Sequence, residues 1–590
     1  MIDKLLRICR VTKLILKERD VYQFVRTMLR HISNINELSA EQFFTGIITC
    51  SRDLAAWQRD IYGRARRKTI TLRYQPKITI ITPVFGIGGG GIKETLESIE
   101  RQYYRNWELY LLVDERPQLK LSKLIREIFK DNQEIKIKIN VNLDHNLAHI
   151  LNEVLNECNG ECIGFLSGSD ELTKDALFEV VNLLNLYPDA DIIYSDEAKK
   201  DQEALVNFFY KPNWSPDLFL SMNYLGNFLC IRTEMIRNVG GFLGKFEDDI
   251  RYDLVLRIIE KTEKIHHIPN ILYHERVPKN SYPEGFTADY SFELHKKALE
   301  EHIKRIGIQG EICDGIFKGS FRVHRRILGQ PKVSIIIPTK DKADELKRCV
   351  ESIESKTTYR EFEIIIVDNA STEFELLQYL KSSRYKVIQY TGKFNFSKIN
   401  NLAAQHSKGE YFLFLNNDTQ VISPWWLEAM LEHAQREEVG VVGAKLLYPD
   451  GLIQHAGVVL ERNSIRHLHR FNGLFEHGYY GTADVIRNFN AVTGACLMVR
   501  KKVFKEVGGF EENLSTIYND VDLCLRVRSR GYLVVYTPYA LLYHHEGMSR
   551  WSDNRKKVES VNFFCSRWNE FVEDDIYWNP NFYFNRLGVF

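Results

Sequence analysis

Short apolar runs alternate with amphipathic stretches through most of this 590-residue chain. KITIITPV, which begins at Lys77, and the run from Trp107 to Val113 have the length and β-branched content of strands. A helical pattern from Ile92 to Arg101 separates them. Runs that are apolar at every position are typical of parallel strands covered on both faces. The pattern therefore predicts an α/β fold built on a doubly wound, mostly parallel sheet.

The stretch from Gly409 to Val421, GEYFLFLNNDTQV, joins a strand pattern directly to polar residues. Tyr411 to Leu415 is apolar throughout, and the polar triplet 416–418, Asn-Asn-Asp, follows it. Open α/β sheets bind their ligands at the carboxyl ends of strands, and a carboxylate at such an end suggests a metal. The same residue types also favour a plain turn before a helix that we expect near Pro424.

Residues 1–75 have a different pattern, and we expect them to form a helical N-terminal extension. From Lys4 to Lys17, basic residues recur every three or four positions with apolar residues between them. Such a helix can lie on an anionic membrane surface, or it can pack on its own protein and leave its basic face in solvent. The sequence is therefore compatible with peripheral membrane contact through residues 1–20 and also with a helix packed on its own protein.

The whole pattern of apolar runs and helical stretches occurs twice. PKITIITPV, which begins at Pro76, returns as PKVSIIIPT at Pro331, and later landmarks return in order at offsets of 249 to 270 residues. These later pairs are VDER and VDNA, CNGECIGFLSGSD and SKGEYFLFLNNDT, VGGF and VGGF, IRYDLVLRI and NDVDLCLRV, and LYHE and LYHHE. We therefore expect two tandem domains, copy one over residues 76–326 and copy two over residues 327–590.

The composition argues against a nucleic-acid-binding, a disulfide-rich or a membrane-spanning protein. With 79 basic and 78 acidic residues, the chain has no broad basic field for nucleic acid. Among the ten cysteines, the spacing of Cys158 and Cys162 fits neither a zinc ribbon nor a redox motif, so we expect reduced thiols in a cytosolic protein. The sequence shows no run of 18 apolar residues and no signal peptide. We expect a cytoplasmic protein; if residues 1–20 contact a membrane, it lies peripherally on the cytoplasmic face of the inner membrane.

From Pro76 to about Asn585, the motifs taken together resemble family 2 glycosyltransferases with the GT-A fold. Copy two is similar to bacterial enzymes that build rhamnose-containing or other O-antigen polysaccharides. Its motifs, in the order the family uses, are SIIIPT, VDNAST, FNFSKINNLAA, GEYFLFLNNDT, VGAKLLYPDGLIQHAGVVL, VTGACLMVRK, VGGFEE, NDVDLCLR and LLYHHE. The resemblance implies an inverting transferase that moves a sugar from a nucleotide-diphosphate donor to a growing cell-surface polysaccharide or lipid-linked glycan.

The resemblance also implies a divalent metal, Mn²⁺ or Mg²⁺, which neutralises the leaving diphosphate. Asp418 suits the role of oxygen ligand, and His544 stands where related enzymes supply a late histidine ligand, with His545 as its competitor. The family usually reads Asp-x-Asp, whereas Asn416 holds the first position here, as is usual in the rhamnosyltransferase-like branch. A histidine after an apolar strand can also be a satisfied core group.

Inversion at the anomeric carbon requires a base that takes the proton of the acceptor hydroxyl. The family aligns its base with Asp520, in NDVDLCLR, whose apolar positions suit either a strand or the first turns of a helix. Asp520 can alternatively cap that helix, and Asn519 competes for the same capping role. We expect Asp522 to be structural support.

The nucleotide is expected to bind in the first half of copy two. By the resemblance, Asp368 accepts the ring N–H of uracil or thymine, which implies a UDP- or dTDP-linked donor, although it can also simply cap its strand. Other polar residues lie at strand ends or at the start of a helix, whose amides favour anions. The expected donor-binding residues are Thr339, Asp368, Asn400, Asn401, Asn416 and Asn417.

Copy one departs from this pattern at the chemical positions. Alignment puts Ser169 at the place of Asp418, leaves Asp170 one residue late, and puts Arg251 at the place of Asp520. A guanidinium cannot act as a base near neutral pH. We expect copy one to have lost transfer chemistry and to bind glycan, nucleotide or copy two.

Two other readings stay open. One is a non-catalytic glycan-binding or scaffold subunit, and the other is a bifunctional transferase with two active sites, for which Asp196 and Glu197 offer copy one alternative carboxylates. A metal ligand and a base in one copy favour the enzyme, and the serine and arginine of copy one argue against two active sites.

Overall fold

A computed structural model describes residues 72–582, apart from the segments 85–90, 115–117, 131–134, 141–146, 202–203, 247–249, 278–288, 462–463, 546–553 and 574. The predicted helical extension lies outside the described residues except for its last four positions, 72–75, which are not helical. Asn185 accepts the backbone N–H groups of Arg73 and Tyr74 at 3.0 and 2.9 Å. The predicted membrane contact of residues 1–20 also lies outside the described part.

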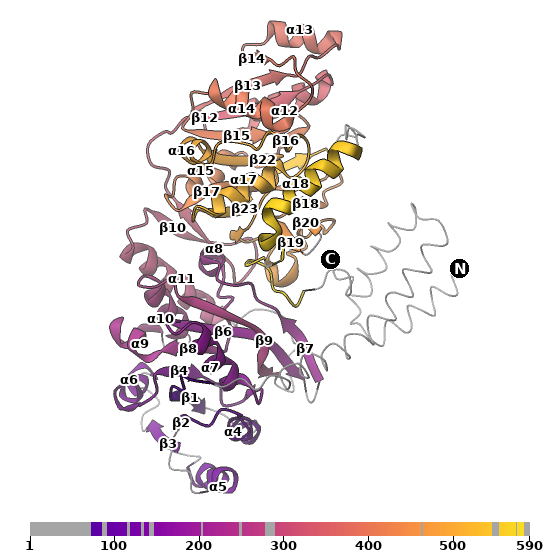
Figure 1. Ribbon diagram of the computed structural model, residues 1–590. Helices are drawn as coiled ribbons and strands as arrows, with labels where there is room; N and C mark the ends of the chain where they lie inside the picture. Colours follow the sequence, from indigo (N-terminus) through magenta and orange to yellow (C-terminus); the bar gives the residue numbers. More distant parts are fainter. Residues whose placement is uncertain are drawn as a thin grey trace, which may run out of the picture. The chain divides into compact units, whose positions relative to one another are not determined.

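Copy one contains one large sheet, with strand order β3-β2-β1-β4-β8-β6-β9-β5 and β7 paired with β6 (Figure 1). Its strands are β1 (Ile78–Val84), β2 (Trp107–Asp114), β3 (Ile135–Asn140), β4 (Cys162–Phe165), β5 (Glu171–Leu172), β6 (Ile192–Asp201), β7 (Ala204–Phe209), β8 (Leu229–Arg232) and β9 (Ile265–Arg276). Its helices are α4 (Ile92–Glu100), α5 (Gln118–Phe129), α6 (Leu147–Glu157), α7 (Ala176–Leu186), α8 (Pro216–Ser221), α9 (Thr233–Asn238), η1 (Gly244–Phe246), α10 (Ile250–Ile259) and α11 (Asp289–Arg305).

A two-stranded hairpin, β10 (Gly310–Asp314) and β11 (Phe321–Arg325), precedes the sheet of copy two. That sheet has the order β14-β13-β12-β15-β22-β17-β23-β16, with β18 on β17 and β21 on β23. Its strands are β12 (Val333–Thr339), β13 (Phe362–Asp368), β14 (Lys386–Gln389), β15 (Tyr411–Leu415), β16 (Thr419–Val421), β17 (Val439–Leu447), β18 (Ile453–His455), β21 (Arg487–Phe489), β22 (Cys496–Arg500) and β23 (Leu533–His544). Position by position, this order repeats that of copy one, as the internal repeat predicts.

The remaining elements of copy two cover this sheet or extend from it. β19 (Val458–Glu461) and β20 (Ser464–His467) form a second hairpin. The helices are α12 (Ala343–Lys356), α13 (Phe374–Ser382), α14 (Phe396–Gln405), α15 (Trp426–Ala434), η2 (Tyr479–Gly481), α16 (Lys501–Glu506), α17 (Asn519–Arg528) and α18 (Asn554–Glu573). Alternate residues of β12, such as Ile335 and Ile337, pack in one core with Leu346 of α12 and Trp426 of α15.

The predicted α/β class is confirmed, and the sheet is more mixed than the sequence pattern indicates. β12 pairs in parallel with β13 and β15, whereas β22 runs antiparallel to both β15 and β17. β15 is buried at all five positions because it lies inside the sheet with helices on both faces. A strand that is covered on both faces has an unbroken apolar run whether it is parallel or antiparallel to its neighbours. The pattern of apolar residues therefore does not predict strand direction.

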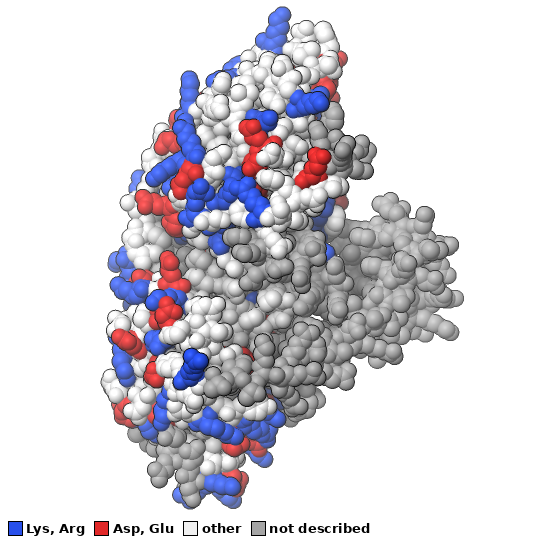
Figure 2. All heavy atoms as spheres, viewed as in Figure 1, with Lys and Arg blue, Asp and Glu red and all other residues white. Residues whose placement is uncertain are grey.

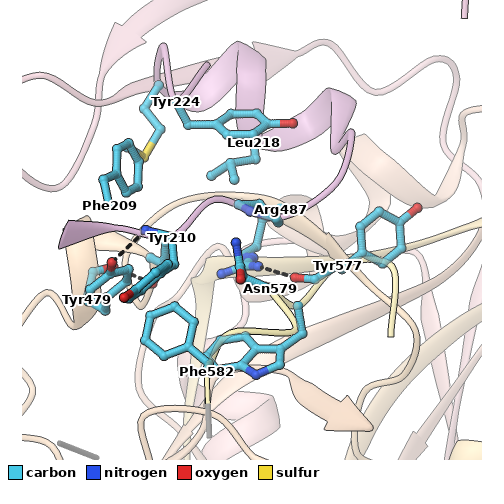
Figure 3. Close-up of a pocket in the computed structure, with 13 residues that line it drawn as sticks. Phe209, Tyr210, Leu218, Tyr224, Tyr479, Arg487, Tyr577, Asn579 and Phe582 are labelled. Atoms are coloured by element: carbon cyan, nitrogen blue, oxygen red, sulfur yellow. Dashed lines mark hydrogen bonds between the residues drawn. The ribbon is translucent and has the colours of Figure 1, made fainter. Parts of the chain in front are cut away.

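Copy one and copy two contact each other through buried polar side chains. Oδ1 of Asn488, on β21, accepts from Ser215 Oγ at 2.9 Å, and its Nδ2 donates to Asp217 at 2.7 Å. Arg436 donates to the same Asp217 at 2.5 Å. Figure 3 shows Tyr210 of copy one beside Tyr479 and Phe582, and the Tyr210 backbone N–H donates to the Tyr479 hydroxyl at 2.9 Å.

Candidate active site

The carboxyl ends of β12, β13 and β15 bring three of the predicted donor-binding residues together. The parallel register places Thr339 directly beside Asp368. From the loop after β15, Nδ2 of Asn417 donates to the Thr339 hydroxyl at 3.1 Å. This edge of the sheet is where an open α/β fold binds its ligand.

Asp368 is buried at the end of β13 and is fixed by a local turn. Its Oδ1 accepts the backbone N–H of Ser371 at 3.1 Å and also the Ser371 hydroxyl. The carboxylate is therefore held in place at the strand end. Recognition of a uracil or thymine ring by this group stays a prediction.

Asp418 and His544 meet because β16 pairs antiparallel with β23, which places Thr419 opposite His544. Oδ1 of Asp418 lies 3.2 Å from Nε2 of His544, and both side chains are only about one tenth exposed, at 11% and 12%. Nδ2 of Asn416 lies 3.2 Å from the same ring nitrogen. Residues more than a hundred positions apart in the sequence thus form one polar cluster.

Gln454, on β18, fixes the orientation of the His544 ring, and the sequence reasoning did not single it out. Its Oε1 lies 2.5 Å from Nδ1 of His544, and its Nε2 donates to the backbone oxygen of His544 at 3.3 Å. An amide oxygen accepts, so Nδ1 carries the proton, and the unprotonated Nε2 accepts from the Asn416 amide and lies beside Asp418. Histidines that bind metals are oriented by this kind of second contact.

The pair formed by Asp418 and His544 fits a divalent ion. Two ligands at right angles, each about 2.1 Å from a metal, lie about 3 Å apart, which matches the separation of these two atoms. His545, the competing candidate, contacts Asp418 through its backbone N–H at 2.9 Å. Burial lowers the pKa of the His545 ring. The geometry therefore favours His544 over His545 as the ring ligand.

Asp520 lies in the first turn of α17, so the helical reading of NDVDLCLR is confirmed. Its Oδ2 accepts the backbone N–H of Gly494 at 2.7 Å, and its Oδ1 accepts that of Val521 at 2.9 Å. Burial raises the pKa of Asp520, although these two N–H groups act in the opposite direction. Tyr518, just before the helix, has a left-handed backbone with φ 63°, a strained geometry that is common at functional sites.

The turn at Gly494 and Ala495 links Asp520 to the polar cluster at His544. Gly494 donates to Asp520, and the oxygen of Ala495 accepts the backbone N–H of Asn416 at 3.0 Å. A Cβ at position 494 would lie 3.1 Å from the Cβ of Asp520, so glycine allows this close approach. One backbone turn thus contacts both the candidate base and the loop that bears Asp418.

The buried histidine His455 contacts the backbone next to the turn at Gly494 and Ala495. Nε2 of His455 accepts the backbone N–H of Thr493 at 3.4 Å, and its Nδ1 lies 2.8 Å from Nδ1 of His467. Burial, with His467 and His544 nearby, holds the pKa of His455 well below its ordinary value. His455 is fully buried, so it shapes the site through the backbone.

Asp522 has the structural role that the sequence indicates. Its Oδ2 accepts from Arg526 at 2.8 Å, and its Oδ1 accepts from the indole N–H of Trp568 at 2.9 Å. Asp253 and Arg257 make the same contact in copy one, also at 2.8 Å. A pair present in both copies serves the fold that they share.

Asn400 and Asn401 lie on α14, and among the described residues their side-chain hydrogen bonds go to partners other than the predicted site residues. Asn401 donates to the oxygen of Phe510 and accepts its N–H, both at 2.9 Å, so this side chain holds a loop. Asn400 donates to Phe396 within its helix, and its buried Oδ1 has no hydrogen-bond partner in the part of the chain that the structure describes. Donor binding by these two residues stays a prediction.

In the described part of copy one, the residues aligned with Asp418 and Asp520 have different surroundings. Asp170 accepts from the Tyr273 hydroxyl at 2.6 Å, from the backbone N–H of Arg276 at 3.0 Å and from the Ser169 hydroxyl at 3.1 Å. Burial raises the pKa of Asp170. Arg251 donates to the oxygen of Asn227 at 3.1 Å. The carboxylate is therefore engaged within the protein, and the place of the base is held by a cation.

Asp196 and Glu197 do not provide copy one with an alternative metal site. Asp196 is buried against His267 at 2.8 Å, and it also accepts both from the backbone N–H of Lys211 and from Asn579 of the C-terminal segment. Glu197 lies 3.1 Å from the ammonium of Lys211. These carboxylates stabilise copy one and its contact with the C-terminal segment.

Residues 79–242 and 334–508 match Glycosyl transferase family 2, so the chain belongs to this family, and one match falls in each copy. It is 34% identical over 556 residues to an uncharacterized protein of Sinorhizobium fredii, covering 91% of this chain and 61% of that one. It is 36% identical over 497 residues to the O-antigen biosynthesis protein RfbC of Myxococcus xanthus, covering 83% of this chain and 39% of that one.

A shorter match joins the chain to an N-acetylglucosaminyl-diphospho-decaprenol L-rhamnosyltransferase of Mycobacterium tuberculosis. The two are 29% identical over 153 residues, which is 24% of this chain and 50% of that protein. The chain thus spans between about two fifths and three fifths of the length of these three relatives.

The surface of the described residues agrees with the charge balance of the sequence. Figure 2 shows basic and acidic side chains interspersed over the face in view, without a continuous field of one sign. None of the helices that the structure describes combines the length and the apolar character that crossing a bilayer requires.

Proposed function

We propose that copy two is an inverting glycosyltransferase that moves a sugar from a UDP- or dTDP-linked donor to a glycan or lipid-linked glycan during the assembly of a cell-surface polysaccharide. The observation that carries this proposal is the turn at Gly494 and Ala495, which joins Asp520 to the loop that bears Asp418. Sugar transfer from a diphosphate requires a base for the acceptor hydroxyl and a positive charge for the leaving group, and this turn connects the segments that offer them.

Asp418 and His544 would hold Mn²⁺ or Mg²⁺ at the carboxyl end of β15. When bound, this ion neutralises the charge that develops on the leaving diphosphate. Thr339, Asp368 and Asn417 lie at the ends of the neighbouring strands and would bind the nucleotide. The relatives that are named for O-antigen biosynthesis and rhamnosyl transfer support a donor and an acceptor of this class.

Asp520 would act as the base. Its carboxylate takes the proton of the acceptor hydroxyl while the oxygen attacks the anomeric carbon, and the bond from that carbon to the diphosphate breaks. Attack from the face opposite the leaving group inverts the anomeric centre. Burial raises the pKa of Asp520, which makes the carboxylate a stronger base than one in water.

Copy one is proposed to be non-catalytic and to support copy two. Asp170 is bound by three protein donors, and Arg251 stands where copy two has Asp520. The contacts of Ser215 and Asp217 with Asn488 favour a supporting role over a second active site.

A donor panel with the purified full chain and Mn²⁺, read as release of the nucleoside diphosphate in the presence of glycan acceptors, tests the proposal. We expect turnover with a UDP- or dTDP-sugar that falls by about 10² to 10⁴ in Asp520→Asn. Arg251→Ala, the matched change in copy one, should stay within a few-fold of the unchanged chain. Turnover that survives Asp520→Asn and is lost in a correctly folded Asp170→Asn chain would place the active site in copy one.

A further inference from the structure

The hairpin formed by β10 and β11 brings together three side chains that bind metals in other proteins. The antiparallel register places Glu311 opposite His324, and Cys313 lies two residues from Glu311 on the same strand. Side chains at such positions share one face of a hairpin. One ligand atom from each of Glu311, Cys313 and His324 lies within 4.8 Å of the other two.

The donor set is distinct from that of the candidate active site. It offers a sulfur, an imidazole nitrogen and a carboxylate oxygen, whereas Asp418 and His544 offer no sulfur. Thiolate and imidazole favour Zn²⁺ over Mg²⁺ or Mn²⁺, because the latter two prefer oxygen. Three protein ligands and one water complete the tetrahedral geometry that Zn²⁺ adopts.

A buried carboxylate faces the far side of the histidine. Nδ1 of His324 lies 3.5 Å from Glu311, while its Nε2 lies 3.9 Å from Oε2 of Glu432. Glu432 is on α15, is 1% exposed, and accepts from Arg322 at 2.8 Å. At 3.9 Å this carboxylate makes no hydrogen bond to Nε2, but its charge favours a proton on that nitrogen and so leaves Nδ1, the nitrogen nearer Glu311, to bind a metal.

We propose that the β10–β11 hairpin is a zinc site formed by Glu311, Cys313 and His324, with water as the fourth ligand. Zinc binding replaces the thiol proton of Cys313, which goes to solvent as the sulfur–zinc bond forms. The hairpin lies between the two sheets in the chain, and Glu432 connects it to α15 of copy two. The site does not depend on the transferase activity proposed above.

Cobalt substitution tests this site because Co²⁺ bound by a thiolate gives a charge-transfer absorption that oxygen and nitrogen ligands do not produce. Full-length protein, treated with chelator and titrated with Co²⁺, should develop this band with about one equivalent of metal and lose it on addition of Zn²⁺. Cys313→Ser should abolish the band, and His324→Ala should weaken Co²⁺ binding at least about tenfold.

Two further variants make the result specific. Cys565→Ser removes the exposed thiol on α18 and should leave the band unchanged. His544→Ala removes the active-site ligand and should also leave it unchanged. Melting curves without metal confirm that each variant folds. Absence of the band in the unchanged protein, or a band that persists in Cys313→Ser, would overturn the proposal.

Discussion

The backbone N–H of Gly494 lies 2.7 Å from Oδ2 of Asp520, the carboxylate oxygen to which it donates. This contact has two effects. It orients the carboxylate at the first turn of α17, and it brings the chain at 494 so close to Asp520 that a Cβ at this position would be crowded.

Gly494→Ala should therefore lower kcat without unfolding the protein. The new Cβ would lie 3.1 Å from the Cβ of Asp520, so the turn or the helix must shift by a few tenths of an ångström. We expect kcat to fall about 10- to 100-fold, since small displacements of a catalytic group carry such costs. Steady-state kinetics on the best donor measure the effect. Gly473→Ala is the matched control, because its nearest contact is 3.4 Å away; equal losses in both variants would contradict the prediction.

The pH dependence of kcat/KM reports Asp520 in the ligand-free protein. A base must be deprotonated, so kcat/KM should fall as the pH drops through the pKa of Asp520 in the folded protein. Because burial raises this pKa, the acid limb should lie above the value of about 3.9 that an ordinary aspartate shows. An acid limb at or below that value, in a chain that remains folded, would argue against this base.

Transfer should require a divalent metal, and the metal concentration it needs should depend on the residue that orients His544. EDTA should abolish transfer, and Mn²⁺ or Mg²⁺ should restore it. Gln454→Leu removes the acceptor for Nδ1 and should raise the metal concentration needed for half activity about 10- to 100-fold. Gln378→Leu, at an exposed position on α13, is the control and should leave the metal response unchanged. Full activity in excess chelator would exclude the metal role of Asp418.

The contact between the two copies should contribute strongly to stability. Burial favours the neutral form of Asp217, but Arg436, with Arg325 and His433, holds the pKa of this carboxyl far below its ordinary value. The contribution of ionised Asp217 to the free energy of unfolding is therefore fully present above a pH of about 4, and it is lost as the pH falls towards the pKa of Asp217 in the folded protein. Asp217→Ala leaves Arg436 without this buried partner and should cost about 3 to 5 kcal/mol in the free energy of unfolding.

Denaturant unfolding of the full chain measures this cost. Asp189→Ala removes an exposed carboxylate paired with Lys264 and should change the free energy of unfolding far less than Asp217→Ala does, because solvent screens a surface ion pair. Similar values for the two variants would show that the buried pair contributes no more than a surface pair.

Membrane contact can be tested independently of the chemistry. The basic stripe of residues 1–20 lies outside the described residues, and its sequence predicts partial, salt-sensitive binding to anionic liposomes. Deletion of residues 1–20 should abolish this binding while nucleoside diphosphate release in solution continues. Cosedimentation at low and high salt gives the measurement, and unchanged binding after the deletion would contradict it.

The sequence by itself determined the elements and their repetition. Tyr411 to Leu415 is apolar at every position, and such a run has few stable places outside the interior of a covered sheet. Motif order placed Asp418, His544 and Asp520 in one copy, and alignment of the two copies showed Arg251 where a base is required. The order of apolar and polar residues along the chain is enough to predict the helices, the strands and their repetition, because both depend on local sequence patterns.

Only the tertiary structure decided which side chains touch. Gln454 and His544 are 90 residues apart, and their 2.5 Å contact depends on the pairing of β17 with both β18 and β23. Asp170 looks like a shifted metal ligand in sequence, yet the fold presents Tyr273 and Arg276 to its oxygens. Strand register and side-chain direction result from packing across the whole sheet, so no local pattern encodes them.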